Sequence, residues 1–274
     1  MKRVAIVGLG WLGMPLAMSL MARGWQVAGT KTTADGVEAA RMCGVESYCL
    51  RLTPELICEA DELEALLKAD ALVITLPASR TAQGGEAYLL AVQQIVDSAL
   101  AYGIPRIIFT SSTSVYGNGG VMKESSPLEP VTAAGKTLKE LETWLHQLPG
   151  TSVDILRLSG LVGPGRHPGR FLAGKTDLTE GSHGVNLVHL DDVTEAVTLL
   201  LQTPKGGHIY NLSAAEHPAR NQFYPAVARQ LGLAAPTFVA EEQTSRGKII
   251  DGSKICRELG FEYQHPDPAR MPLQ

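Results

Sequence analysis

Three glycines at G-x-G-x-x-G spacing follow an apolar run at the start of the chain. Residues 4–7 read as a buried strand, and Gly8, Gly10 and Gly13 come directly after it. In a dinucleotide-binding unit the first glycine allows a tight turn, the second leaves room for a pyrophosphate, and the third lets the next helix pack closely. Apolar spacing over residues 11–23 predicts that helix, whose unpaired N–H groups would face the phosphates. The opening segment therefore predicts a dinucleotide site.

Composition limits the class of protein. The 274 residues are 45% hydrophobic and 19% charged, enough for one large α/β domain with a smaller appendage. A net charge of -4 gives no electrostatic case for nucleic acid or an anionic membrane as a partner. No metal-ligand spacing links the cysteines, so we expect reduced thiols and no metal site at Cys43, Cys49, Cys58 and Cys256.

Residues 2–22 combine a basic start with an apolar body, as a secretory signal does. Three glycines and Pro15 within this segment would make a poor signal helix, so we assign it to the folded domain. No other stretch reaches the ~18 apolar residues of a membrane span. We therefore expect a soluble, cytoplasmic protein.

Apolar runs alternate with helical patterns along most of the chain. The expected strands are residues 4–7, 25–28, 71–76, 106–110, 153–158, 186–190 and 208–212. The expected helices between them include residues 60–68, 86–102, 133–148 and 191–202. This alternation predicts an α/β fold, a Rossmann doubly wound parallel sheet.

The alternation weakens in a Gly/Pro-rich loop after Leu161 and again after Asn211. Helices at residues 221–231 and 253–259 and a strand at residues 237–240 are expected to form a small C-terminal α/β lobe. We expect a Rossmann domain and a substrate-side lobe, with the Rossmann domain comprising residues 1–165 and 185–215 and the lobe residues 166–184 and 216–274.

The end of the second strand bears on the choice of nicotinamide cofactor. NAD-binding units place an Asp or Glu about 20 residues after the glycines, for the ribose 2′-hydroxyl. Here Thr30, Lys31 and Thr32 occupy that region, and the first acid is Asp35. A lysine among hydroxyls suits a 2′-phosphate, so these residues predict NADP rather than NAD. The alternative is a solvated turn in which Lys31 contacts nothing.

Four further segments carry a family resemblance. They are residues 107–117 (IIFTSSTSVYG), 156–166 (LRLSGLVGPGR), 188–193 (VHLDDV) and 208–212 (HIYNL). In this order they resemble landmarks of the extended short-chain dehydrogenase/reductases, the NAD-dependent epimerase/dehydratase family, over residues 1 to about 215. The resemblance implies a cofactor across the carboxyl ends of the strands and catalysis by a Ser/Thr, a Tyr and a Lys.

The sequence departs from that catalytic set. Ser112 matches the hydroxyl position, but Ala134 and Leu138 stand where the Tyr-x-x-x-Lys pair belongs. Neither can transfer a proton, so the chain resembles an atypical member of the family. Tyr116 is the nearest substitute for the missing tyrosine. Lys136 and Lys139 have the wrong helical offset, and we expect them to be solvated.

The motifs and the resemblance together give the candidate site residues. Around the cofactor they are Gly8, Gly10, Trp11, Leu12, Gly13, Thr30, Lys31, Thr32, Leu76, Pro77, Ala78, Thr110, Ser111, Ser159, Gly160 and Leu161. The catalytic candidates are Ser112 and Tyr116. An anionic group of the substrate would meet Arg166, His167 and Arg170, although this segment is also explained as a structural turn.

One histidine has a structural explanation. His189 lies in an apolar run before two acids, and we expect a hydrogen-bonded core histidine with Asp191 or Asp192 capping the next helix.

Three functions fit these patterns. The first is an NAD(P)-dependent oxidoreductase or epimerase acting on a small polar or nucleotide-linked substrate, as a possible homodimer. The second is a catalytically inactive NADP-binding sensor or interaction protein, which the loss of the Tyr/Lys pair favours. The third is a β-hydroxyacid dehydrogenase of the phosphogluconate type, against which the Ser-rich loop and the short tail argue.

Overall fold

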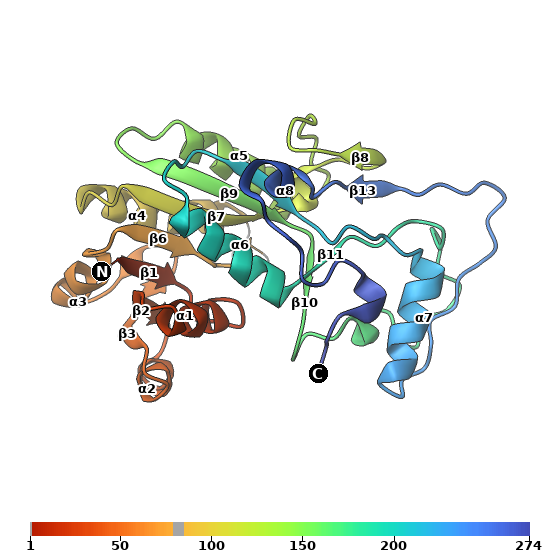
Figure 1. Cartoon of the computed structure of the whole chain (residues 1–274), viewed down its shortest axis with the longest axis horizontal. Coiled ribbons are helices and arrows are strands. Elements are labelled where there is room, and N and C mark those ends of the chain that lie inside the picture. Colours follow the sequence, from red (N-terminus) through yellow and green to blue (C-terminus); the bar gives the residue numbers. More distant parts are fainter. Residues whose placement is uncertain (1, 79–84) are drawn as a thin grey trace. The chain divides into compact units, whose positions relative to one another are not determined.

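The computed structural model describes residues 2–78 and 85–274, which form two compact units (Figure 1). The first unit comprises Met1–Val115, Pro130–Leu156 and Val197–Ile209, and the second comprises Tyr116–Glu129, Arg157–Ala196 and Tyr210–Gln274. This division differs from the expected domains, because residues 116–129, 157–165, 185–196 and 210–215 fall in the second unit.

A seven-stranded sheet organises the fold. Its order is β12 (Ile209–Leu212), β9 (Ser152–Leu158), β7 (Arg106–Ser112), β6 (Ala71–Ile74), β1 (Arg3–Val7), β2 (Gln26–Lys31) and β3 (Glu46–Cys49). The pairs β1–β2, β1–β6, β2–β3 and β6–β7 are parallel. This confirms the predicted Rossmann sheet, whose order reverses direction at β1, next to β6. Ligands of such sheets bind at that switch point, beyond the carboxyl ends of the strands.

The strands at the switch point are apolar because helices cover parallel sheets on both faces. Residues 4–7 of β1 and all of β6 are buried. The helices that belong wholly to the first unit are α1 (Gly13–Ala22), α2 (Ala34–Met42), α3 (Ala60–Leu67), α4 (Gly85–Ala101) and α5 (Ala133–His146). The same unit contains the short hairpin of β4 (Arg51–Leu52) and β5 (Leu56–Ile57). No helix in the described part of the chain is long and apolar enough to span a membrane.

The second unit is built from short elements. β8 (Gly120–Met122) pairs in parallel with β13 (Lys248–Ile250), and β10 (Gly160–Val162) pairs in parallel with β11 (Leu187–His189). Its helices are α7 (Arg220–Gln230) and α8 (Lys254–Leu259), while α6 (Leu190–Gln202) has residues in both units. An apolar cluster stabilises this unit: Val162, Val185, Leu187, Ala214, Phe223, Val227, Met271 and Leu273.

Two sequence predictions of strands need correction. Residues 237–240 are not a strand, since only an isolated bridge joins Phe238 to Leu178. The partner segment turns at Asp177 and Glu180, whose φ angles are 54° and 60°, so the pairing does not extend. Residues 186–190 do contain the strand β11, but it pairs with β10 and lies outside the seven-stranded sheet.

Candidate functional site

The glycine turn after β1 is fixed by close backbone packing. Gly8 has a φ of 105°, a conformation that L side chains rarely adopt. Its N–H donates to Thr30 Oγ1 at 3.0 Å, and its carbonyl accepts from Thr75 Oγ1 at 2.5 Å. A Cβ on Gly13 would overlap the Gly8 carbonyl oxygen. Two of the three glycines are therefore required by the fold of the turn itself.

The middle glycine has a different environment. Gly10 is exposed, and a Cβ built there would meet nothing within 4 Å. α1 begins three residues later, and its first turn contains no acidic side chain. Helix N-termini attract anions, and no carboxylate of that turn opposes one here. The turn thus offers open space and a favourable field, which fits a pyrophosphate. Of its other predicted contacts, Trp11 is half-buried and Leu12 is buried.

The hydroxyls at the end of β2 have separate roles. Thr30 is buried and holds the Gly8 N–H, while Thr33 caps α2 by accepting the Gly36 N–H at 3.0 Å. Lys31 is half-buried and Thr32 is exposed. Lys31 therefore offers a ligand an ammonium and Thr32 a hydroxyl at this strand end, and the Thr33 hydroxyl, which accepts a bond, keeps its proton for donation.

Strands β6 and β7 end in a hydrogen-bonded group of hydroxyls. Thr110 Oγ1 donates to the Ile74 carbonyl at 2.9 Å, and Ser111 Oγ donates to Glu142 Oε2 at 2.7 Å. Ser112 is half-buried, and its Oγ accepts the Ser114 N–H at 3.1 Å. That bond uses a lone pair of Ser112, so the hydroxyl keeps its proton for donation.

Residues 76–78, predicted on the adenosine side, follow β6. The Leu76 carbonyl accepts the Tyr88 hydroxyl at 2.7 Å. Leu76 and Ala78 are half-buried, and Pro77 is exposed.

Helix α5 carries the positions of the missing catalytic pair. Ala134 is half-buried, and Leu138 is only 3% exposed. Lys136 and Lys139 are exposed, as predicted. Glu142 follows Ala134 and Leu138 at four-residue spacing and is buried, a position that sequence reasoning missed. The spacing alone was a usable signal, since residues four apart share a helix face.

Tyr116, in the second unit, is the centre of a buried network. Its side chain is 0% exposed, its hydroxyl donates to Asn211 Oδ1 at 2.6 Å, and it accepts from Arg157 Nη1 at 2.8 Å. Burial raises the pKa of Tyr116, and the Arg157 charge and the two hydrogen bonds oppose part of that increase. The acid–base role of Tyr116 stays a prediction, and these contacts give the residue a structural role.

Ser159, in the second unit, carries a buried hydroxyl that a ligand could bind. It is 4% exposed, and its hydroxyl has no hydrogen-bond partner within residues 2–78 and 85–274. A buried polar atom without a partner costs free energy, which a ligand that bonds to it would recover. The next residue, Gly160, packs closely, since a Cβ there would lie 2.7 Å from Leu187 Cδ2. Leu161 is half-buried.

The predicted anion-binding residues after β10 form a turn. His167 is buried and caps a short 3-10 helix, Pro168–Arg170, because its Nδ1 accepts the Gly169 N–H at 2.9 Å. Burial, and then the charge of Arg170, lower the pKa of His167, so it is neutral at pH 7. Arg170 is exposed and Arg166 half-buried. The local bonds match the structural-turn alternative, and anion binding stays a prediction.

His189 is a core histidine, as predicted, but the expected helix cap is wrong. Its Nδ1 accepts the Asp191 N–H at 3.0 Å, so His189 caps α6 in place of either acid. Asp192 instead accepts the N–H groups of Gln264 and His265.

The side chains of His189, Asp191 and His265 lie close enough to hold a metal ion. However, Nδ1 of His189 already accepts the Asp191 N–H, and its Nε2 bonds to the Pro272 carbonyl at 2.6 Å. The buried histidine has no lone pair left for a metal.

The fold, the glycine turn and the hydroxyl-rich strand end define a class. The chain belongs to the NAD dependent epimerase/dehydratase family, whose sequence profile matches residues 4–213. It is 70% identical over 275 residues to Protein YeeZ of Escherichia coli (strain K12), in an alignment that covers 100% of both chains. Membership of this family sets aside the β-hydroxyacid dehydrogenase alternative.

Solved structures share the fold. The UDP-Glc/GlcNAc 4-epimerase from the human pathogen Campylobacter jejuni superposes with a TM-score of 0.79 at 16% identity, covering 98% of this chain and 96% of that one. The Bordetella bronchiseptica enzyme WbmG in complex with NAD gives a TM-score of 0.78 at 19% identity, covering 98% and 91%. The family and such neighbours bind a nicotinamide dinucleotide.

Proposed function

We propose that the chain is a nicotinamide-dinucleotide-dependent oxidoreductase or epimerase that acts on a small polar or nucleotide-linked substrate. The observation that carries this is the glycine turn: packing requires Gly8 and Gly13, whereas the space beside exposed Gly10 is open. The orphaned, buried hydroxyl of Ser159 supports a bound ligand in the second unit. When bound, the dinucleotide would supply hydride transfer at its nicotinamide ring.

We further propose that the preferred cofactor is NADP. Lys31 ends β2 and Thr32 follows it, at the place where an NAD-binding unit has a carboxylate for the ribose diol. A lysine ammonium attracts a 2′-phosphate, whereas it gains little from a neutral hydroxyl. Thr30 would contribute to cofactor binding indirectly, because its hydroxyl accepts the Gly8 N–H and so holds the glycine turn.

Ser112 is the proposed substrate-orienting residue. Its hydroxyl accepts from the backbone and so can donate its own proton to a substrate oxygen. The proton transfer that the family resemblance assigns to tyrosine and lysine has no counterpart at Ala134 and Leu138. An acid–base group, if the reaction needs one, must come from elsewhere in this chain or from the substrate.

A second candidate is an NADP-binding protein without turnover. It is favoured by the burial of Leu138, which fills the position of the usual lysine with a packed apolar side chain. It is also favoured by Tyr116, whose hydroxyl is already held by Arg157 and Asn211. Binding experiments do not separate the two candidates, so turnover needs its own measurement.

Calorimetric titration with NADPH and NADH tests the cofactor proposal. Lys31→Ala removes one charge-assisted contact, worth about 1.5 kcal/mol or more, and should weaken NADPH binding about tenfold or more while NADH changes less than about twofold. Gly10→Val places a side chain in the open space and should weaken both. Lys136→Ala, an exposed lysine of the same unit, is the matched control and should change neither. Equal losses for the two cofactors in Lys31→Ala would refute the phosphate contact.

Oxidation of NADPH with nucleotide sugars and small aldehydes tests turnover. Ser112→Ala should reduce the rate at least tenfold without changing the affinity for NADPH, since the hydroxyl is proposed to contact substrate. If every rate of the unaltered protein stays at background while NADPH binds, the protein without turnover is the correct candidate.

A further inference from the structure

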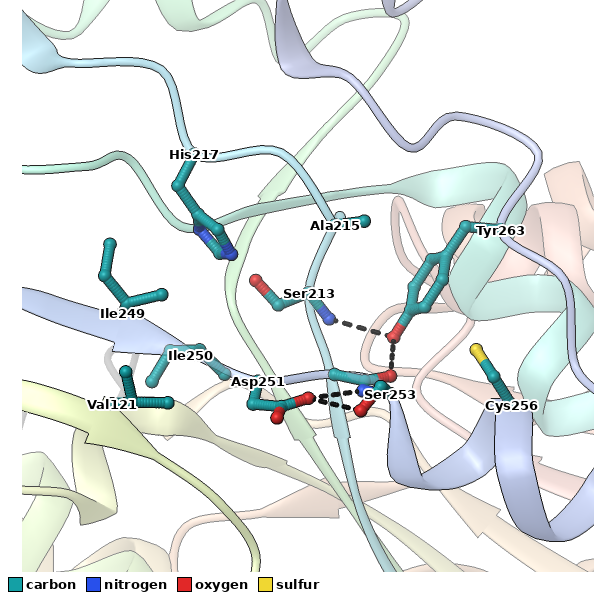
Figure 2. A pocket seen from close by; sticks show the side chains of 11 residues that line it. Val121, Ser213, Ala215, His217, Ile249, Ile250, Asp251, Ser253, Cys256 and Tyr263 are labelled. Atoms are coloured by element: carbon teal, nitrogen blue, oxygen red, sulfur yellow. Dashed lines mark hydrogen bonds between the residues drawn. The ribbon is translucent and has the colours of Figure 1, made fainter.

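A pocket of about 320 Å³ lies within the second unit (Figure 2). It is lined by residues of β8, β13 and α8, of the segment that follows β12 and of the segments on either side of α8: Val121, Ser213, Ala215, His217, Ile249, Ile250, Asp251, Gly252, Ser253, Cys256 and Tyr263. None of these is among the residues proposed to bind the dinucleotide or to take part in the reaction. A volume of this order can hold a small molecule.

One wall of the pocket is apolar. Val121 and Ile249 are direct partners in the parallel pair β8–β13, and Ile250 follows on the same strand. Val121 is 59% exposed, so this strand pair presents apolar surface that no other described element covers. Such a wall favours a ligand with an apolar part, because contact between the two removes the apolar surface of the wall and of the ligand from water.

Ser213 supplies an unpaired polar group. It is 1% exposed, and its hydroxyl has no hydrogen-bond partner in the described part of the chain. The nearby Tyr263 hydroxyl accepts the Ser213 N–H at 3.2 Å and donates to the Gly252 carbonyl at 2.8 Å, so it does not serve the serine hydroxyl. In Figure 2 the Ser213 hydroxyl points to the side of the pocket where His217 lies. A ligand there would relieve the cost of a buried hydroxyl without a partner.

His217 supplies an acceptor. Its Nδ1 lies 2.9 Å from the Val185 carbonyl, and a carbonyl only accepts, so the proton is on Nδ1 and Nε2 carries a lone pair. Burial lowers the pKa of His217, which keeps the ring neutral at pH 7. An O–H or N–H group of a ligand matches this nitrogen.

The charges of the pocket argue against an anion. None of the described residues that line it is a lysine or an arginine, and Asp251 is the acid among them. Ser253 donates to Asp251 Oδ1 from its N–H at 2.9 Å and from its hydroxyl at 2.6 Å. Burial opposes ionisation, but these bonds and the charges of Lys123 and Arg257 hold the pKa of Asp251 below its usual value. A carboxylate or phosphate would therefore meet a negative charge with no cation in the lining.

We propose that this pocket binds a neutral, ring-sized molecule with an apolar face and one O–H or N–H donor, such as a phenol or a heteroaromatic amide. The apolar strand pair would contact the ring, and His217 Nε2 and the Ser213 hydroxyl would bond to its polar edge. The proposal is independent of the dinucleotide site, whose glycine turn belongs to the first unit.

Titration of the full chain with phenol, followed by NMR of its isoleucine methyl and histidine ring signals, tests the proposal. Phenol should shift the signals of Ile249, Ile250 and His217 saturably. Anisole, which lacks the donor, should bind at least fivefold more weakly, and benzoate should bind no more tightly than anisole. Saturable shifts confined to other residues, or none, would overturn the proposal. Tighter binding of benzoate than phenol would overturn the ligand class.

Substitutions inside and outside the pocket distinguish binding in the pocket from general effects of a substitution on the protein. Ala215 lines the pocket yet is exposed, so Ala215→Trp should obstruct it and lower phenol affinity at least tenfold without unfolding the chain. Ala240→Trp, at an exposed position of the same unit outside the lining, is the matched control and should leave phenol affinity unchanged. Ser213→Ala should preserve the fold and lower the affinity severalfold. An unchanged affinity in Ala215→Trp would show that phenol binds elsewhere.

Discussion

Tyr116 connects two polar side chains in the interior of the second unit. Its hydroxyl joins Asn211 to Arg157, and the guanidinium also bonds to the Glu124 carbonyl at 3.3 Å. Tyr116→Phe would leave an amide oxygen and a buried guanidinium each short of a partner. We expect a loss of about 1–3 kcal/mol in the free energy of unfolding, measured by urea denaturation. Unchanged stability together with lost turnover would instead identify Tyr116 as an acid–base group.

Helix α5 matters because Glu142, on its third turn, holds Ser111. The helix begins with a side-chain cap, since Thr132 Oγ1 accepts the Gly135 N–H at 3.0 Å. Thr132→Ala should lower the free energy of unfolding by about 1 kcal/mol, and Thr132→Ser should retain most of it. Thr143→Ala is the control on the exposed face of the same helix, where the hydroxyl bonds back to the Lys139 carbonyl. Because such back-bonding does not favour helices, the control should cost less than the cap in the same urea experiment.

Elements were predictable where the apolar pattern was strong. Strands β1 and β6 are continuous apolar runs, so their burial followed from sequence, whereas β3 at the sheet edge mixes Ser47 and Tyr48 with Cys49 and was missed. α2 was missed because it contains Gly36 and its apolar residues, apart from alanines, are only Val37 and Met42. The roles of Glu142 and of Asn211 depend on partners far along the chain. Neither local propensity nor periodicity encodes such contacts, which is why the glycine turn was predicted and the polar networks were not.

The whole molecule should lose stability on mild acidification. Burial lowers the pKa of His167 and of His217, so below about 6.5 the unfolded chain binds protons that the folded chain does not. The free energy of unfolding contributed by these groups is present above that pH and decreases as the pH falls through the window below it. The urea midpoint should decrease between about pH 7 and pH 5.5.

A paired variant isolates this effect. His167→Asn keeps a capping side chain, and His217→Gln keeps a donor for the Val185 carbonyl. The double variant should show a smaller decrease over the same range. An equal decrease would assign the acid sensitivity to other groups. Glu124 and Asp192 are not among them, because burial raises the pKa of each carboxyl and so favours the folded state as the pH falls.

The packed leucine on α5 makes the departure from the usual chemistry hard to reverse. Restoring Tyr at half-buried Ala134 alone supplies a phenol without a cation, and restoring Lys at Leu138 alone places an ammonium in a site that is 3% exposed. Burial of a charge costs free energy unless it is paired, and the nearby Glu142 carboxyl already accepts the Ser111 hydroxyl. The tyrosine substitution alone thus restores no catalytic pair, and the lysine substitution alone lowers the stability of the fold. The buried Leu138 side chain therefore makes a return to the Tyr/Lys pair by single substitutions unfavourable, and any reaction of this protein proceeds without that pair.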